Sequence, residues 1–120
     1  MSEAAKRVLV VDDNVDSARV TGLLLSALGF EVRLAHSGPE ALEAAADFVP
    51  DAVLLDIGLP GMDGYQVARA LRAARGAELR LLALSGYGQE EDLRRSAEAG
   101  FDHHLLKPAD PAKMLELLQS

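Results

Sequence analysis

The sequence contains no cysteine and no tryptophan, and aromatic residues make up only 4% of its 120 residues. Without cysteine the chain has no disulfide bond, no thiolate metal site and no cysteine nucleophile. Hydrophobic residues nevertheless account for 49% of the chain, so leucine, valine and alanine must build most of the core. This length is sufficient for one ordinary core, and we expect residues 1–120 to form a single domain.

The chain also lacks a long apolar run and an excess of positive charge. Its first residues, MSEAAKR, are polar, and the apolar run Val8–Val11 is too short for a signal peptide or a membrane span. The formal net charge of −7 argues against direct nucleic-acid binding, which needs a basic patch to neutralise phosphates. Nine of the twelve basic residues are arginine, and they are scattered along the sequence. We therefore expect a cytoplasmic protein with an acidic, solvated surface and no membrane insertion.

Short apolar runs alternate along the chain with longer segments that have helical spacing. The expected strands are Arg7–Val11, Val32–Ala35, Ala52–Leu55, Leu79–Leu84 and His104–Leu106. Strands that alternate with helices form a parallel sheet covered on both faces, and continuous apolar strands fit that burial. The pattern predicts an α/β fold with five strands and five helices.

Three helical segments have apolar residues at helical spacing, which predicts one apolar face on each helix. These faces are Val20, Leu23, Leu24, Ala27 and Leu28 in the first, Leu42, Ala45, Ala46 and Val49 in the second, and Val67, Ala70, Leu71 and Ala74 in the third. The fourth expected helix, Gln89–Ala99, has a thinner apolar face.

The boundaries of these helices are marked by residues that favour helix ends. The expected N-terminal caps are Ser37, Asp63 and Asp110, and a proline stands close behind the first and last of them. The residues expected to end helices are Gly29, Gly76 and Gly100.

Polar residues stand directly after four of the apolar runs. They are Asp12 and Asp13 after the first run, Asp56 after the third, Ser85 after the fourth and Lys107 after the fifth. The carboxyl ends of parallel strands lie at one edge of the sheet, and ligands of such folds bind beyond that edge. We therefore expect these five side chains to gather in one place.

Three neighbouring carboxylates repel each other and need a positively charged partner. Lys107 supplies a single charge, which is too little, so we expect a hard divalent cation such as Mg²⁺, which prefers oxygen ligands. A carboxylate can act as a covalent nucleophile, while a cation, a lysine and a hydroxyl can bind phosphoryl oxygens. The set of residues indicates a phosphoryl-transfer site.

The motifs VLVVDDN, LLDIGLPGMDG, LALSGYG and FDHHLLKP occur in this order over essentially the whole chain. Together they closely resemble the receiver domain of two-component response regulators. The resemblance implies a flavodoxin-like, doubly wound sheet with strand order 2-1-3-4-5. It also implies that a phosphohistidine on a sensor kinase donates a phosphoryl group to one aspartate. The stretches SGYGQEED and FDHHLLKPADP are similar, in addition, to receiver modules attached to hybrid histidine kinases.

The resemblance assigns the phosphoryl acceptor and the metal ligands. Asp56 would be the acceptor and a ligand of the cation. Asp13 would bind Mg²⁺ directly, with Mn²⁺ as an alternative ion, and Asp12 would bind it mainly through water. The backbone carbonyl of Gly58 would complete the protein ligands.

The resemblance also assigns the residues that respond to the phosphoryl group. Ser85 would donate a hydrogen bond to a phosphoryl oxygen, and Lys107 would pair with the phosphoryl group. Ser85 and His104 would form the switch, in which His104 takes a position that is usually aromatic. The partners implied are a sensor histidine kinase or phosphotransfer domain and a downstream effector protein or domain.

Two other classes of protein are weighed against this hypothesis. An aspartyl-phosphate phosphatase of haloacid-dehalogenase type also uses strand-end aspartates and Mg²⁺, but it needs a general-acid aspartate where this chain has Gly58. A flavodoxin-like cofactor binder would need a phosphate loop rich in aromatic and hydroxyl side chains. We expect a switch that catalyses only its own phosphorylation and dephosphorylation, either as a stand-alone receiver or as part of a longer protein.

Overall fold

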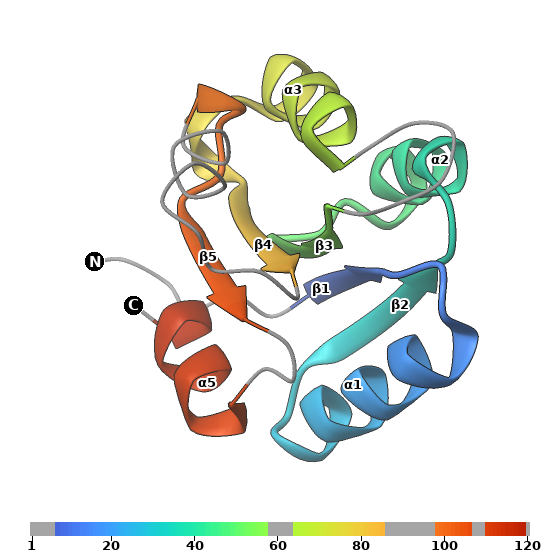
Figure 1. Ribbon diagram of the computed structural model, residues 1–120, viewed down its shortest axis with the longest axis vertical. Helices are drawn as coiled ribbons and strands as arrows, with labels where there is room; N and C mark the ends of the chain where they lie inside the picture. Colours follow the sequence, from blue (N-terminus) through green and yellow to red (C-terminus); the bar gives the residue numbers. More distant parts are fainter. Residues whose placement is uncertain (1–6, 58–63, 86–97, 107–109, 120) are drawn as a thin grey trace.

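The computed structural model describes residues 7–57, 64–85, 98–106 and 110–119. Its sheet has five parallel strands in the order β2-β1-β3-β4-β5 (Figure 1). The order reverses beside β1, as it does in doubly wound folds with this strand order. The predicted α/β class, strand order and flavodoxin-like topology are therefore confirmed.

The strands are β1 (Arg7–Val11), β2 (Glu31–Ala35), β3 (Ala52–Asp56), β4 (Arg80–Ser85) and β5 (His103–Leu106). The helices are α1 (Val15–Ala27), α2 (Gly38–Phe48), α3 (Gly64–Arg75) and α5 (Pro111–Gln119), and a 3-10 turn, η1 (Gly76–Glu78), follows α3. Each predicted strand boundary lies within one residue of the observed one. The helix expected over Gln89–Ala99 falls mostly in 86–97, outside the described residues.

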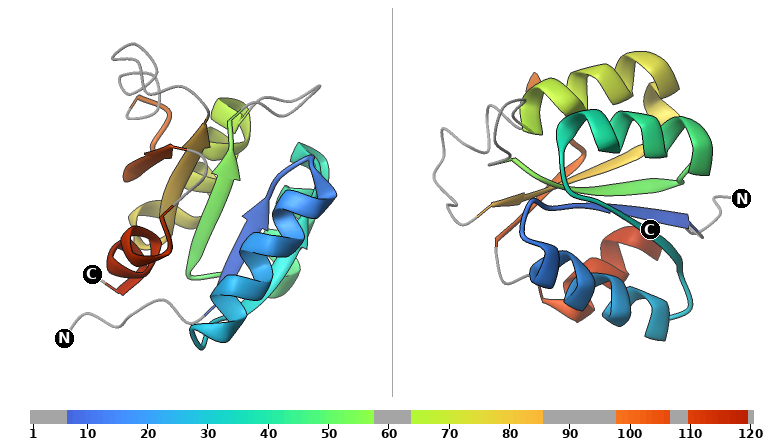
Figure 2. Two further views of the ribbon diagram at one scale, coloured as in Figure 1. Left: turned by 60° about the horizontal axis from the view of Figure 1, so that its bottom comes forward. Right: turned by 90° about the vertical axis from the view of Figure 1, so that its right-hand side faces the viewer.

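Helices cover the sheet on both faces, with α2 and α3 on one side and α1 and α5 on the other (Figure 2). Two core clusters correspond to these two faces. Side chains alternate along β1, so Leu9 and Val11 belong to the cluster with α2 and α3, whereas Val8 and Val10 belong to the cluster with α1 and α5. Because both faces are buried, β1 and β3 are apolar at almost every position.

The predicted helix caps are present wherever the structure describes them. The Ser37 hydroxyl accepts a hydrogen bond from the Glu40 N–H at 3.2 Å, and the Asp110 carboxylate accepts one from the Ala112 N–H at 3.0 Å. The third predicted cap, Asp63, lies outside the described residues. The residues predicted to end helices all have positive φ, at 101° for Gly29, 75° for Gly76 and 102° for Gly100.

The apolar face predicted for the first helix is largely wrong. Val20 and Leu23 are 67% and 66% exposed, and α1 buries the smaller Ala18 and Gly22 together with Leu25. Gly22 lies so close to β2 that a Cβ there would stand 3.0 Å from Leu34 Cδ2. Close packing of the helix on the sheet selects small residues, whereas periodicity alone favours the face with more large ones.

The apolar face predicted for the second helix is partly wrong, because close packing on the sheet again selects small residues. Ala45 is buried and Leu42 partly buried as predicted, but Ala46 and Val49 are exposed, while two alanines outside the predicted face, Ala41 and Ala44, are buried. Val49 is the C-terminal cap and has a left-handed φ of 51°. In the third helix, Val67 and Leu71 are buried as predicted, Ala70 is half-buried and Ala74 is exposed.

Candidate functional site

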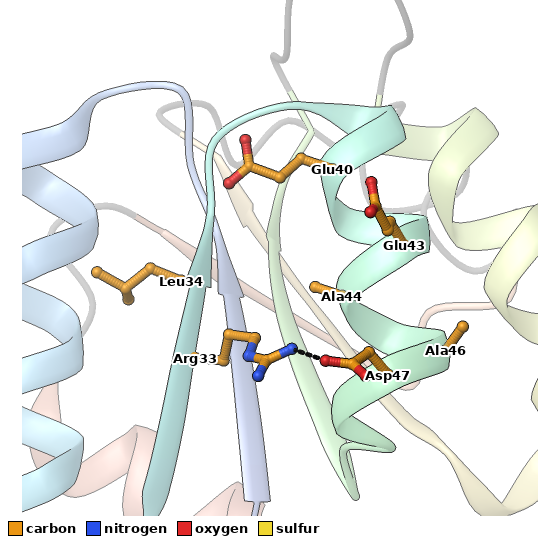
Figure 3. Close-up of a pocket in the computed structure, with 7 residues that line it drawn as sticks. All are labelled: Arg33, Leu34, Glu40, Glu43, Ala44, Ala46 and Asp47. Carbon is orange, nitrogen blue, oxygen red and sulfur yellow. Dashed lines mark hydrogen bonds and ion pairs between the residues drawn. The ribbon is translucent and has the colours of Figure 1, made fainter.

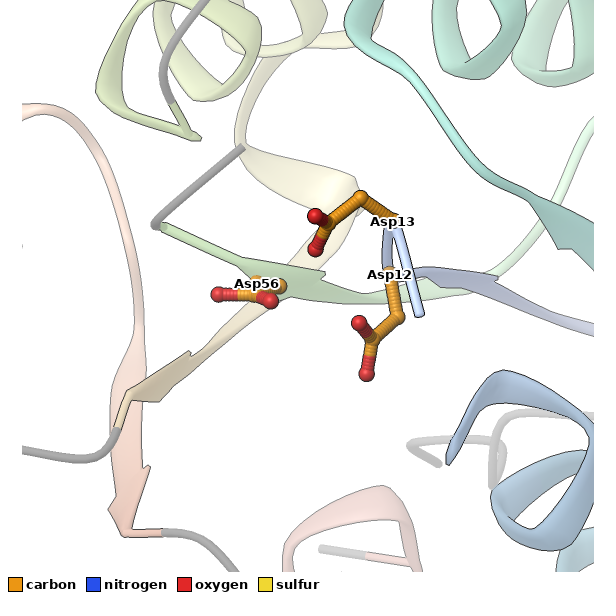
Figure 4. Close-up of side chains that lie close together, drawn as sticks. All are labelled: Asp12, Asp13 and Asp56. Carbon is orange, nitrogen blue, oxygen red and sulfur yellow. The ribbon is translucent and has the colours of Figure 1, made fainter. Parts of the chain in front are cut away.

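Three aspartates meet at the carboxyl edge of the sheet. Asp12 and Asp13 follow β1, and Asp56 is the last residue of β3 (Figure 4). One carboxylate oxygen from each residue lies within 4.8 Å of the other two. The structure therefore brings together the three acids that the sequence pattern predicts at this edge.

The register of β1 and β3 explains why two of these acids are neighbours. Val10 pairs with Leu54, and both side chains belong to the core cluster beneath α1 and α5. Side chains alternate along a strand, so Asp12 and Asp56, two residues further on, project toward the same face. The N–H of Asp12 still donates to Ala35 O at 3.0 Å, so the β1–β2 ladder continues to this residue. Strand pairing thus sets the relative position of the two carboxylates.

The three acids differ in burial. Asp12 and Asp56 are only 3% and 8% exposed, and they are the buried charged residues among those whose burial the structure describes. Asp13 is exposed. Burying a carboxylate is costly unless it is paired, hydrogen-bonded or bound to a metal. The arrangement therefore places two desolvated acids behind one acid that opens to solvent.

Local hydrogen bonds orient Asp12 and begin the first helix. The Asn14 N–H donates to Asp12 Oδ1 at 3.0 Å. Asn14 is also the N-terminal cap of α1, and its Oδ1 accepts a hydrogen bond from the Ser17 N–H at 2.9 Å. Asn14 therefore joins the end of β1 to the start of α1.

The start of α3 packs directly on the backbone that carries Asp56. The Gly64 N–H donates to Ile57 O at 3.2 Å. A Cβ at Gly64 would lie 2.3 Å from Ile57 Cα and 2.9 Å from Asp56 O. The expectations from the sequence did not include this contact. One feature of the sequence could have indicated it: a glycine stands eight residues after the strand-end acid Asp56, where a helix was expected to begin.

The backbone places Ser85 at the end of β4, the strand next to the one that carries Asp56. Asp56 pairs with Leu84, the residue before Ser85 at the end of β4. Ser85 in turn pairs with Leu106 at the end of β5, directly before Lys107. Lys107 itself lies outside the described residues, and for Ser85 the structure describes the backbone. Their roles therefore stay predictions.

The two remaining predicted site residues have different outcomes. Gly58 lies outside the described residues, so its part as a metal ligand stays a prediction. His104 is half-buried in β5, where it pairs with Ala83. Its neighbour His103 is exposed, in agreement with the opposite orientation of adjacent strand residues. The switch role of His104 also stays a prediction.

A separate pocket lies between β2 and α2 (Figure 3). Its lining residues are Arg33, Leu34, Glu40, Glu43, Ala44, Ala46 and Asp47. An ion pair of 2.7 Å between Arg33 and Asp47 crosses it. None of the predicted site residues lines this pocket, so the acids at the strand ends form a site distinct from it.

Comparison with known proteins identifies the family. The family model of the response regulator receiver domain matches residues 8–119. The chain therefore belongs to the response regulator receiver domains of two-component systems, which are generally signalling modules rather than classical enzymes. It is 35% identical over 115 residues to the DNA-binding response regulator MtrA of Mycobacterium tuberculosis, a match that covers 96% of this chain and 50% of MtrA.

Solved structures give the same result. A response regulator from Burkholderia pseudomallei with a phosphorylated aspartic acid and a calcium ion has a TM-score of 0.88 and 30% identity, covering 96% of this chain and 67% of that one. The CheX–CheY–BeF3–Mg complex of Borrelia burgdorferi gives a TM-score of 0.85 and 28% identity, covering 93% of this chain and 85% of that one.

The chain spans about half the length of the MtrA proteins that it matches. The likeness to receiver modules of hybrid kinases stays a prediction. Within the described residues, no helix combines the length and the apolar character needed to cross a membrane.

Proposed function

We propose that residues 1–120 work as one phospho-acceptor unit, in which Asp56 receives a phosphoryl group from a phosphohistidine in a Mg²⁺-dependent reaction. The observation that carries this proposal is the convergence of Asp12, Asp13 and Asp56, with oxygens within 4.8 Å of one another. A sensor histidine kinase or a phosphotransfer domain is the proposed donor. A downstream effector protein or domain is the proposed recipient of the signal.

The donor set fits a hard divalent cation. All three side chains offer oxygen, and their negative charges need compensation in a partly desolvated place. Asp12, Asp13 and Asp56 would hold Mg²⁺ or Mn²⁺, and we include the Gly58 carbonyl in the proposed set. Such an ion, when bound, supplies positive charge beside the phosphoryl oxygens.

The part of Asp56 in the reaction follows from its position. A carboxylate oxygen of Asp56 attacks the phosphorus, the N–P bond of the phosphohistidine breaks, and its electron pair returns to the imidazole. The product is an acyl phosphate on Asp56. β3 is buried along its whole length, so it presents the nucleophile from a rigid support.

The remaining proposed residues would bind and report the phosphoryl group. Ser85 is the last residue of β4, the strand next to Asp56, and Lys107 follows Leu106 in the sequence; both would bind phosphoryl oxygens. Movement of Ser85 toward the phosphoryl group would be coupled to His104 on β5, which pairs with Ala83, two residues before Ser85 on β4. The phosphoryl group would thereby bias the face that binds the effector.

Two structural neighbours and the sequence support this proposal over the phosphatase alternative. One neighbour holds a phosphorylated aspartic acid, and another includes magnesium. The phosphatase mechanism needs an acid two residues after the nucleophile, where this chain has Gly58. The chain belongs to the receiver family, whose members are generally signalling modules, and this membership also favours a switch over a phosphatase.

Mass spectrometry of the intact protein after incubation with acetyl phosphate tests the proposal. We expect one added phosphoryl group with Mg²⁺, none after chelation, and none in Asp56→Asn. Glu43→Gln, which removes an exposed acid on α2, is the matched control and should behave like the wild-type chain. An adduct that persists in Asp56→Asn refutes the assignment of the acceptor, and turnover of generic phosphate esters would favour the phosphatase.

The donor is tested separately by a phosphotransfer profile. Purified, autophosphorylated sensor kinases of the source organism are mixed with the chain and sampled at short times. We expect one kinase to transfer its phosphoryl group much faster than the others, and only when Asp56 is intact. Equal, slow transfer from every kinase would contradict a specific donor.

A further inference from the structure

His36 lies beside the acid site, directly after β2. It follows Ala35, the last residue of β2, and its side chain is half-buried. Its Nδ1 stands 3.0 Å from the backbone carbonyl oxygen of Asp12. The imidazole therefore contacts the main chain of a buried acid rather than its carboxylate.

The direction of this hydrogen bond follows from the chemistry of its two atoms. A carbonyl oxygen can only accept, so Nδ1 of His36 carries the hydrogen and donates it to Asp12 O. The N–H of Asp12 donates in the opposite direction, to Ala35 O at 3.0 Å. Two consecutive residues at the end of β2 thus hold Asp12 by its N–H and by its C=O.

A third hydrogen bond fixes the carboxylate itself. The Asn14 N–H donates to Asp12 Oδ1 at 3.0 Å. The bond from His36 restrains the carbonyl of Asp12, and so the backbone from which the Asp12 carboxylate extends. The His36 bond is the one of the three that comes from a side chain, so it can be removed by substitution while the backbone bonds remain.

We propose that His36 is a positioning residue for the divalent cation site, acting through the carbonyl of Asp12. This role rests on the proposed function, because it presumes that Asp12 holds a cation. Residues that orient metal ligands commonly contribute to metal affinity although they do not touch the metal. Loss of the Nδ1 donor should therefore weaken cation binding without removing any ligand.

The test compares variants of His36 by NMR titration of the metal-free protein with Mg²⁺ at one fixed pH. His36→Phe keeps a flat ring but has no donor. His36→Asn places an amide N–H₂ the same number of bonds from the backbone as Nδ1, so it can restore the hydrogen bond. His103→Phe is the matched control, because His103 is exposed on β5.

We expect His36→Phe to weaken Mg²⁺ binding by a factor of about three to ten, the worth of one ordinary hydrogen bond. His36→Asn should recover most of the affinity, and His103→Phe should match the wild-type chain. In phosphorylation with acetyl phosphate, His36→Phe should need more Mg²⁺ for half-maximal rate but reach a similar rate at saturation. A purely structural role would lower stability without this shift in Mg²⁺ dependence.

The outcomes separate this proposal from the proposed function. If the wild-type chain binds Mg²⁺ and Asp12→Asn does not, but His36→Phe binds like wild type, the positioning role is refuted while the cation site stands. Equal weakening in His36→Phe and His36→Asn also refutes it, because the donor would then be irrelevant. If the wild-type chain binds no Mg²⁺, the proposed function fails and this role fails with it.

Discussion

The carboxyl and amino edges of the sheet differ in the charged side chains that they carry and in what these side chains contact. At the carboxyl edge, three like-charged side chains converge on one another. At the amino edge, arginine side chains donate hydrogen bonds to backbone carbonyl oxygens. These bonds run from Arg7 to Phe48, from Arg72 to Gly76, Leu79 and Gly100, from Arg75 to Pro50, and from Arg80 to Leu118. One edge gathers like charges, and at the other edge arginine side chains bind backbone acceptors.

The difference follows from what helix and strand ends leave unpaired. The last carbonyl groups of a helix have no partner within the helix. Two of the acceptors, Phe48 and Leu118, lie in the last turns of α2 and α5, and the other four lie in connections between helices and strands. Arginine carries five donors in a planar fork, so one side chain can bind several such carbonyls. Arg72 also pairs with Asp102 at 3.0 Å, whose carboxylate accepts the Leu81 N–H at 2.9 Å. We therefore expect stability and function to separate along the strand direction.

The strongest challenge to that separation is Gly64, a carboxyl-edge residue with a structural role. Gly64→Ala should lower the free energy of unfolding by about 3 kcal/mol or more, because the new Cβ would overlap Ile57 Cα. Urea denaturation measures the loss. Phosphorylation of the folded fraction should also fall, since the backbone of Asp56 must shift.

Gly22→Ala is the matched control for this substitution. Its new Cβ would meet side-chain atoms alone, with Leu34 Cδ2 at 3.0 Å and Val32 Cγ1 at 3.5 Å, and alanine favours the helix by about 1 kcal/mol over glycine. We expect a change in stability within about 1 kcal/mol. Equal stability of the Gly64→Ala and Gly22→Ala variants would contradict the close approach of α3 to the Asp56 strand.

The next largest effect concerns the amino edge. Arg72→Ala should destabilise the chain by about 2–3 kcal/mol, because it leaves the carbonyls of Gly76, Leu79 and Gly100 without this donor. Phosphorylation of the folded variant by acetyl phosphate should equal that of the wild type. Arg69→Ala, at an exposed position of the same helix, should change stability by no more than about 0.5 kcal/mol. A loss of phosphorylation at full folding would break the separation of the two edges.

The smallest effect should have the opposite sign. Asp13→Asn removes one of three like charges, so without divalent cation the variant should be more stable than wild type by up to about 1 kcal/mol. Added Mg²⁺ should then stabilise the wild-type chain more than the variant, because binding to the folded state raises its stability. Thermal unfolding with and without Mg²⁺ measures both changes, and Glu43→Gln serves as control. A less stable variant in cation-free buffer would contradict the repulsion between the acids.

The fold was predictable because its signals are local and repeated. The five apolar runs predicted the boundaries of every strand within one residue. The ends of helices were marked by the caps Ser37 and Asp110 and by glycines. The convergence of the acids followed from one geometric rule about parallel strands. The burial of Asp12 and Asp56 beside an exposed Asp13 also follows the alternation of side chains along β1 and β3.

Interactions between distant segments were not predictable. The arginines look scattered in sequence, yet Arg72 contacts Gly100, 28 residues away, and Arg80 contacts Leu118, 38 residues away. His36 stands 24 residues from Asp12, and its bond needs the register of β1 and β2 to be known. The prediction of the buried face of α1 was wrong because it also depends on a distant segment. Gly22 faces inward, where it packs close to Leu34 of β2.

One consequence of the β1–β3 pairing concerns how the width of the acid site is set. Neighbouring strands are held about 4.7–4.9 Å apart by main-chain hydrogen bonds, whatever side chains they carry. Asp12 and Asp56 extend from two such neighbours in matching register. The hydrogen-bonded backbone therefore sets the distance between the points from which the two acids extend. Two acids grafted at the corresponding positions of another parallel sheet would inherit the same spacing without any redesign of the loops.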